Sequence, residues 1–257
     1  MPSQCADALK PARYARVATL VSTRNYNEDA TIWHQGTEPA DTTPADGATA
    51  SAKAAALGGP LRIALLGYRS QPHAGGQGVY MRYLSKALVE AGHTVDVISG
   101  PPYPHLDPRV RLIELPSLDL FENGLTSLRP HHLTSMSNII EWLSQLTGGF
   151  AEPQTFGRRA AKYLRQHGHH YDLIHDNQSL SYGMLDIQDM GLPLVTTVHH
   201  PITSDLRIAL GAARNWRERL FIRRWHSFLN MQQKVIKQLH NIVTVSDCSR
   251  QDIARDF

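Results

Sequence analysis

Short apolar runs alternate with amphipathic stretches along the chain from residue 61 onward. Six apolar runs have the length of buried strands, at 61–68, 93–99, 109–116, 171–177, 192–200 and 241–246. Stretches with an apolar residue every three or four positions separate them and predict helices at 78–91, 133–146 and 155–167, with a further helical region before residue 240. Apolar strands that alternate with helices indicate a Rossmann-like α/β fold, a parallel sheet with helices on both faces.

The helix expected at 78–91 has a clear apolar stripe. Its members recur at helical spacing and are Val79, Tyr83, Leu84, Ala87, Leu88 and Ala91. Gly92 follows, where a left-handed residue would end the helix. We therefore expect this stripe to pack on the sheet.

Residues 1–59 have a different character from the rest. The segment 36–60, GTEPADTTPADGATASAKAAALGGP, is rich in Ala, Thr, Pro, Asp and Gly and shows no apolar period. Such a composition cannot bury enough surface to offset the entropy lost on ordering. We predict a disordered, low-complexity leader over 1–59 and a folded domain over 60–257. A start codon chosen upstream of the true domain would explain the leader equally well.

Composition narrows the class of protein. No apolar run approaches the length of a membrane span, and the first twenty residues lack the apolar core of a secretory signal. The two cysteines, Cys5 and Cys248, fit neither a disulfide framework nor a metal site. A formal charge of +3 gives no argument for nucleic acid as a partner. We expect a cytoplasmic protein.

Polar residues gather where the predicted strands end. In open α/β sheets ligands bind beyond the carboxyl ends of the strands. That rule selects the loops 69–78, 99–105, 176–181 and 199–205 as candidate binding segments. Ordinary loop polarity is the alternative for each of them taken alone.

Three glycines, Gly75, Gly76 and Gly78, stand just before and at the start of the first helix. Helix N-termini favour anions, and glycine lets the main chain approach one closely. The spacing argues against a dinucleotide fingerprint, because Met81 stands where its third glycine is needed, and no P-loop motif occurs. The pattern favours a diphosphate, and a glycine-rich turn without a ligand is the alternative.

Four segments together resemble a known family. They are AGGQGVYMRYLSKALVEAGHTVDVIS, YDLIHDNQSLSYG, GLPLVTTVHHPI and IVTVSDCSRQDIARDF, and they occur in this order between residues 74 and 257. Their order and spacing are similar to those of the N-terminal domain of family-4 retaining glycosyltransferases, which have the GT-B fold. The resemblance implies transfer of a sugar from a nucleotide-sugar donor to an acceptor hydroxyl with retention of configuration.

The resemblance also implies roles for particular residues. Gly75, Gly76 and Gly78 would lie against the donor diphosphate, where amides stabilise the charge of the leaving group. His199 matches the histidine near the reacting sugar and is the catalytic candidate; a strand-end histidine bonded to a backbone carbonyl is the alternative. The family manages without an essential metal or cofactor, so we expect none here.

Four further residues are candidates for acceptor binding. Asp176 and Asn177 close a predicted strand, while Asp205 and Arg207 follow the segment HHPITS. Each has a plain structural alternative: the first two are turn formers, and Asp205 suits the first turn of a helix. Ser246 is expected to cap the last helix.

The chain differs from the family pattern at its end. In the family a C-terminal Rossmann-like domain supplies most of the donor pocket, and the sequence stops at Phe257 before such a domain. We therefore expect the acceptor-side half of an enzyme, inactive alone, whose site is completed by a missing C-terminal domain or by another chain.

The segment 214–240 is both basic and amphipathic. Phe221, Trp225, Phe228, Val235, Ile236 and Leu239 form its apolar stripe, and eight basic but only two acidic side chains lie between residues 203 and 240. Such a helix can dock on anionic lipid. The stripe can equally pack on the sheet, so peripheral contact with the inner face of the membrane, or with a lipid-linked acceptor, is one of two interpretations.

Two other function classes compete with glycosyl transfer. A non-catalytic module could hold a carbohydrate or a lipid head group without transferring anything. An oxidoreductase with a dinucleotide cofactor is disfavoured by the glycine spacing.

Overall fold

The computed structural model describes residues 31–34, 59–72 and 76–257, and their strands form one seven-stranded sheet. The strand order is β1-β7-β6-β5-β2-β3-β4. Six strands are parallel and correspond to the six predicted apolar runs: β2 Arg62–Gly67, β3 Thr94–Ser99, β4 Arg111–Glu114, β5 Leu173–Asn177, β6 Leu194–Val198 and β7 Asn241–Thr244. The Rossmann-like α/β class is thereby confirmed.

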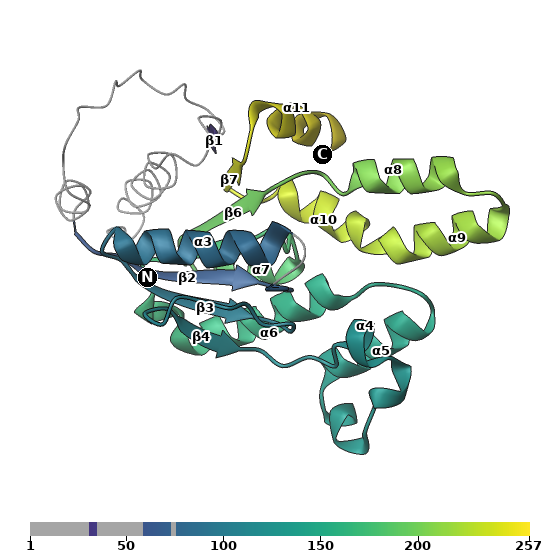
Figure 1. Cartoon of the computed structure of the whole chain (residues 1–257), viewed down its shortest axis with the longest axis horizontal. Helices are drawn as coiled ribbons and strands as arrows, with labels where there is room; N and C mark the ends of the chain where they lie inside the picture. Colours follow the sequence, from purple (N-terminus) through teal and green to yellow (C-terminus); the bar gives the residue numbers. More distant parts are fainter. Residues whose placement is uncertain (1–30, 35–58, 73–75) are drawn as a thin grey trace, which may run out of the picture.

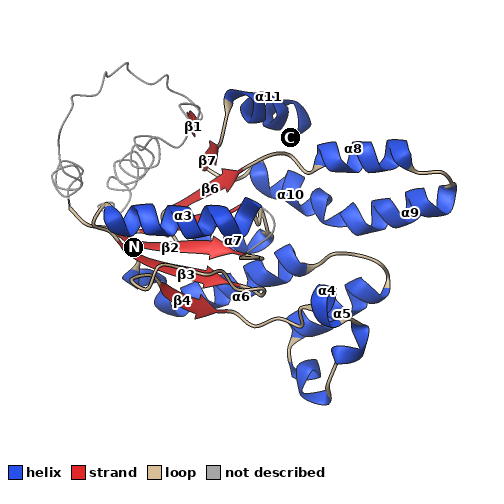
Figure 2. Cartoon of the chain, viewed as in Figure 1, coloured by secondary structure: helices blue, strands red, loops and turns tan. Residues whose placement is uncertain are grey.

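Helices cover both faces of this sheet (Figures 1 and 2). Alternate residues of β2 point to opposite sides: Ile63 and Leu65 pack with helix α3, Gly76–Glu90, and Ala64 and Leu66 pack on the other face. That second face is covered by α6 Glu152–His167, α7 Tyr182–Asp189 and α10 Leu229–Ile236. The remaining helices are α4 Leu120–Asn123, α5 Met136–Leu146, α8 Thr203–Ala212, α9 Trp216–Trp225 and α11 Asp247–Asp256.

Helix α3 presents to the sheet a face that matches the expected stripe only in part, since Leu88 is buried and Leu84 packs against the core as expected. Its buried residues are Gly78, Met81, Ser85 and Leu88, whereas Val79 and Tyr83 are 40% and 47% exposed. Small residues at 78 and 85 let the helix approach the strands closely, and Met81 fills the space between them. Burial here follows shape as well as hydrophobicity.

The predicted disordered leader contains one described strand. Residues Thr31–His34 form β1, which pairs antiparallel with β7 at the edge of the sheet. The prediction of disorder is therefore wrong at these four residues, whose sequence TIWH is rich in residues that favour strands. The other residues of the leader lie outside the described part of the chain.

The basic segment 214–240 is divided into separate elements. Val235, Ile236 and Leu239 are buried in the core beneath the sheet, as the packing interpretation predicted. Only α9 leaves large apolar side chains exposed, with Trp216, Leu220 and Phe221 each about 60% exposed or more. Helices α8 and α9 form a hairpin that extends away from the sheet (Figure 1). Among the described helices, none has both the length and the apolar character needed to cross a bilayer.

The order of the strands fixes where a ligand can bind. From β2 the chain proceeds outward through β3 and β4, and it then returns to build β5, β6 and β7 on the other side of β2. The switch point of the sheet therefore lies between β2 and β5. Their carboxyl ends are aligned, since Leu66 pairs with Asp176 in the parallel register. Open α/β sheets bind ligands at such a point.

Candidate functional site

The switch point joins the start of α3 to the ends of β5 and β6. Asn177, the last residue of β5, is 1% exposed and bonds in both directions. Its amide nitrogen donates to the main-chain oxygen of Gln77 in the first turn of α3, at 3.4 Å. Its amide oxygen lies 2.6 Å from Nε2 of His199, the first residue after β6. Asn177 thus holds the glycine-bearing turn and His199 side by side.

His199 is held as a neutral imidazole. Burial, followed by the charge of neighbouring His200, lowers its pKa to about 4. With the Asn177 amide oxygen as acceptor, Nε2 carries the proton and donates, which leaves the Nδ1 lone pair as an acceptor. Among the described residues no hydrogen bond reaches Nδ1. The predicted alternative, a bond to a backbone carbonyl, is not what the structure shows.

A second layer fixes the ring of His199. The Tyr80 ring meets it edge-on with centroids 4.6 Å apart, and the Tyr80 hydroxyl lies 3.3 Å from the Thr197 hydroxyl. Thr197 in turn lies 2.6 Å from Nε2 of His175, whose pKa is lowered to about 4 by burial. Sequence reasoning missed Tyr80, whose place four residues after Gly76 on a helix was the available signal.

Gln178 holds the main chain around His199, and sequence reasoning missed it as well. Its side-chain oxygen accepts from the His199 amide at 2.7 Å, and its side-chain nitrogen donates to the His200 carbonyl at 2.7 Å. Its own backbone is left-handed, with φ of 54°. The loop after β5 is therefore shaped to bring this amide under the loop after β6.

Asp176 has the turn-forming role that the sequence left as its alternative. The side chain is fully buried and its carboxylate accepts from the amides of Ser179 and Leu180 at 3.1 and 3.3 Å. Burial raises its pKa to about 6, although these hydrogen bonds act in the opposite direction. In this position Asp176 supports the loop and does not reach a surface where an acceptor binds.

The glycines at positions 78 and 76 differ in what surrounds their backbone. A Cβ at Gly78 would lie 2.0 Å from the main-chain oxygen of Gln71, so the glycine is needed for contact with the chain's own loop. This contact accounts for Gly78 structurally, and its assignment to the diphosphate stays a prediction. A Cβ at Gly76 would meet no atom within 4 Å, and Gly76 is the first residue of α3. Gly75 lies outside the described residues.

Arg207 is held in contacts within the protein, whereas Asp205 is largely exposed. Arg207 donates to Asp256 at 2.9 Å and to Ser204 at 2.9 Å, and so joins α8 to α11. This ion pair lowers the pKa of Asp256 to about 2 and accounts for Arg207 structurally. Asp205 is more than half exposed and faces the His200 ring at 3.4 Å. Ser246 caps α11 by accepting from the Ser249 amide, as expected.

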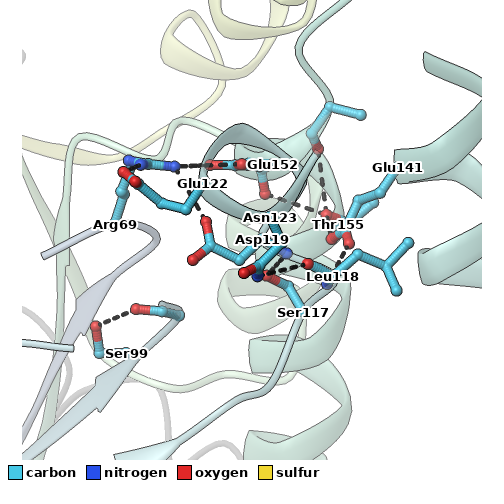
Figure 3. A network of polar contacts seen from close by, with 12 residues as sticks. Arg69, Ser99, Ser117, Leu118, Asp119, Glu122, Asn123, Glu141, Glu152 and Thr155 are labelled. Carbon is cyan, nitrogen blue, oxygen red and sulfur yellow. Dashed lines mark hydrogen bonds and ion pairs between the residues drawn. The ribbon is translucent and has the colours of Figure 1, made fainter. Parts of the chain in front are cut away.

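A group of carboxylates surrounds Arg69 in the loop after β2 (Figure 3). Arg69 pairs with Glu122 at 2.9 Å, Glu152 at 3.1 Å and Asp119 at 3.5 Å. One guanidinium is shared by three carboxylates, and Glu152 has a side chain only 14% exposed. Burial raises the pKa of Glu152 to about 7 despite the pairing with Arg69.

We predict that Glu152→Gln changes the pH dependence of stability. Because the pKa of Glu152 is higher in the folded state than in the unfolded chain, the folded state holds the proton and stability falls as pH rises from about 4.5 to 7. The variant lacks this loss. Its free energy of unfolding relative to wild type should rise by roughly 2–3 kcal/mol between pH 5 and pH 8 in denaturant titrations.

Glu122→Gln is the matched control, since Glu122 pairs with the same arginine but is half exposed. It should change the stability by a similar small amount at both pH values. A constant difference between Glu152→Gln and wild type across this range would contradict the assignment.

The fold and the site together indicate the class of protein to which this chain belongs. Doubly wound α/β sheets bind ligands at the switch point, and here an open helix start and a buried polar cluster lie at that point. The model of Glycosyltransferase Family 4 matches residues 74–257, and the chain belongs to this family. The resemblance inferred from the sequence is confirmed.

One curated relative is much closer than the solved structures. The MMP alpha-(1->4)-mannosyltransferase of Mycolicibacterium hassiacum (strain DSM 44199 / CIP 105218 / JCM 12690 / 3849) is 50% identical over 200 residues, which are 77% of this chain and 48% of the relative. The chain thus spans about half the length of this relative.

Two solved structures are more distant. LpCGTa in complex with UDP has 14% identity and a TM-score of 0.36, over 73% of this chain and 52% of that one. The glycosyltransferase VinC in complex with dTDP has 20% identity and a TM-score of 0.32, over 61% and 40%. Neither similarity is high enough to support a statement about fold or ligand.

Proposed function

We propose that this chain is the acceptor-side domain of a retaining glycosyltransferase that transfers a mannosyl group from a nucleotide-sugar donor to a hydroxyl of a sugar acceptor. Membership of the family supports the reaction class, and the relative's name supports mannose. The single observation that carries the site is the Asn177 bridge, which places the open turn at Gly76 beside the neutral ring of His199.

The donor diphosphate would lie against the start of α3. This helix has 15 residues, and its first amides have no partner within the helix. They and the helix dipole favour an anion, and the space around Gly76 admits one. As the bond to the sugar breaks, negative charge grows on the departing diphosphate, and fixed amides stabilise it without reorganising. Gly75 joins this proposal by its position in the motif.

His199 would orient the donor sugar. Its free Nδ1 accepts a hydrogen bond from a sugar hydroxyl, and the low pKa keeps that lone pair available at neutral pH. The same contact favours the geometry in which the sugar faces both the diphosphate and the acceptor. Of the four acceptor candidates, Asp205 retains an exposed carboxylate for this role, whereas Asp176, Asn177 and Arg207 are engaged by the protein itself.

The complete reaction requires more than the described site. We propose that a second, donor-binding domain supplies the nucleotide contacts, so that these 257 residues alone do not transfer sugar. No group of three or more His, Cys, Asp or Glu side chains within the described residues is arranged to hold a metal. A reaction without metal or cofactor, and a cytoplasmic location, stay predictions. Peripheral membrane contact also stays a prediction. Of the segment 214–240, only α9 exposes large apolar side chains that could make this contact.

The test uses this chain together with the proposed donor-binding domain, which we call the full-length protein. It measures transfer from GDP-mannose or UDP-mannose to a methyl α-mannoside acceptor. We expect a new α-linkage, read from the one-bond carbon–proton coupling at the anomeric carbon. A β-linked product would contradict retention. Binding of the acceptor without any turnover would favour the non-catalytic module instead.

A further inference from the structure

A pocket of about 380 Å³ opens between α5, the start of α6 and the α9–α10 segment. This volume lies within the range of about 300–1,000 Å³ that is usual for sites of small organic ligands. Its walls include Phe150, Gln154, Arg224, Ser227, Phe228 and Met231. None of these residues belongs to the His199 site, and of the six only Phe228 was named from the sequence, as a member of the apolar stripe of 214–240.

A series of aromatic contacts links a wall of the pocket to the loop after β2. The Phe150 ring stacks on Trp225 at 5.2 Å and meets Phe228 edge-on at 5.5 Å, so its position is fixed. It also meets the Tyr68 ring edge-on at 6.3 Å. Tyr68 follows β2 directly, and the Gln77 side chain in the first turn of α3 acts to lower the pKa of its hydroxyl, against the larger effect of burial. The pocket therefore lies one aromatic residue away from the switch point.

Arg224 brings a positive charge to this largely apolar pocket. Its guanidinium donates to Ser227 at 2.8 Å, to Thr147 at 2.6 Å and, at 3.5 Å, to the carbonyl and the hydroxyl of Ser144, and all of these acceptors are neutral. No carboxylate in the described part of the chain pairs with it. Gln154 is half-buried in the same pocket, and its side chain makes no hydrogen bond to any described residue. These two side chains thus offer polar groups to a ligand.

We propose that this pocket binds a sugar ring of the acceptor chain, away from the hydroxyl that reacts. A pyranose has a face of C–H groups and a rim of oxygens. The apolar face suits Phe150, Phe228 and Met231, and the oxygens suit Arg224 and Gln154. An alkyl chain would bury the Gln154 amide without a hydrogen-bond partner, which is costly. This proposal rests on the proposed function and assigns its acceptor class.

The position of the pocket has a consequence for specificity. The acceptor would extend from the pocket past Phe150 and Tyr68 to the strand ends, where its terminal hydroxyl reacts. An acceptor of several sugar units engages both places, whereas a single sugar engages only one. The pocket therefore selects oligosaccharides over monosaccharides.

The experiment measures binding to the 257-residue chain without any donor. The probe is the methyl glycoside of an α-(1→4)-linked mannotetraose, titrated by calorimetry and by saturation-transfer NMR. We expect Arg224→Ala and Gln154→Leu each to weaken binding about tenfold or more. Arg223→Ala is the matched control, because Arg223 is adjacent but exposed and outside the pocket, and it should bind like wild type. Melting temperatures show that each variant is folded.

Several results would overturn the inference. The first is no binding at millimolar concentrations of the probe. The second is equal affinity for the probe in wild type and both pocket variants. The third is binding of octyl glucoside to the pocket without binding of the mannotetraose. Since no donor is present, the result is independent of catalysis. Transfer by the full-length protein with unchanged probe affinity in the variants would reject the pocket alone. Binding that depends on Arg224, without any transfer, would reject the proposed function alone.

Discussion

His199→Ala is expected to lower kcat/KM for sugar transfer by the full-length protein on the order of 10²-fold, the loss that follows removal of one fixed polar contact in a closed active site. Among the described residues, His199 is the one whose side chain presents a free ring nitrogen beside the turn at Gly76, and the alanine removes it. It also leaves Asn177 without its partner at 2.6 Å. Initial rates at several donor concentrations separate the effect on kcat from that on KM.

His200→Ala is the control for this substitution. His200 is adjacent in sequence, its side chain is 58% exposed, and its interaction with Asp205 is long. Its rate should stay within about twofold of wild type. Because the pKa of His199 is about 4, the ratio of variant to wild-type rates should be constant from pH 5.5 to 8. A loss that appears only below pH 6.5 would indicate that the protonated histidine acts, and would contradict the assigned role.

Gly78→Val is expected to destabilise the folded domain by about 3 kcal/mol, because its Cβ would overlap main-chain atoms of Gln71 that cannot move independently. Gly76→Val is expected to change the free energy of unfolding by less than about 1 kcal/mol, since the space around it is open and valine is no worse than glycine in a helix. Denaturant titrations of the 257-residue chain measure both.

The same pair of variants separates structure from function. In the full-length protein Gly76→Val should raise the donor KM about tenfold or more while the protein stays folded, because the new side chain occupies the space assigned to the diphosphate. Gly78→Val should lower the amount of folded enzyme and leave the donor KM of the folded fraction close to wild type. The opposite distribution of effects would mean that the two glycines have been assigned the wrong way round.

The strands were predictable because their burial on both faces leaves a continuous apolar run. Each of β2 to β7 lies within a predicted run, and no end differs by more than two residues. The face of α3 was not predictable in this way. Its contact with the sheet depends on the small residues Gly78 and Ser85, which a search for apolar positions overlooks. The strand β1 was missed because it is a four-residue segment in a polar, low-complexity neighbourhood.

The candidate site was predictable in its location but only partly in its residues. The rule for strand ends located His199 and Asn177 correctly at one edge of the sheet. It could not foresee that Asp176 would turn inward to hold a loop, or that Arg207 would pair with Asp256, fifty residues away in sequence. Gln178 and Tyr80 act through their contacts with His199, and such contacts become visible only when three separate loops are brought together.

The most direct test of the central claim is a crystal structure of the full-length protein with a nucleoside diphosphate and a mannoside. We predict phosphate oxygens within about 3 Å of the main-chain amides at the start of α3, and His199 facing the sugar. A diphosphate bound elsewhere on the molecule, with the turn at Gly76 facing bulk solvent, would contradict the claim.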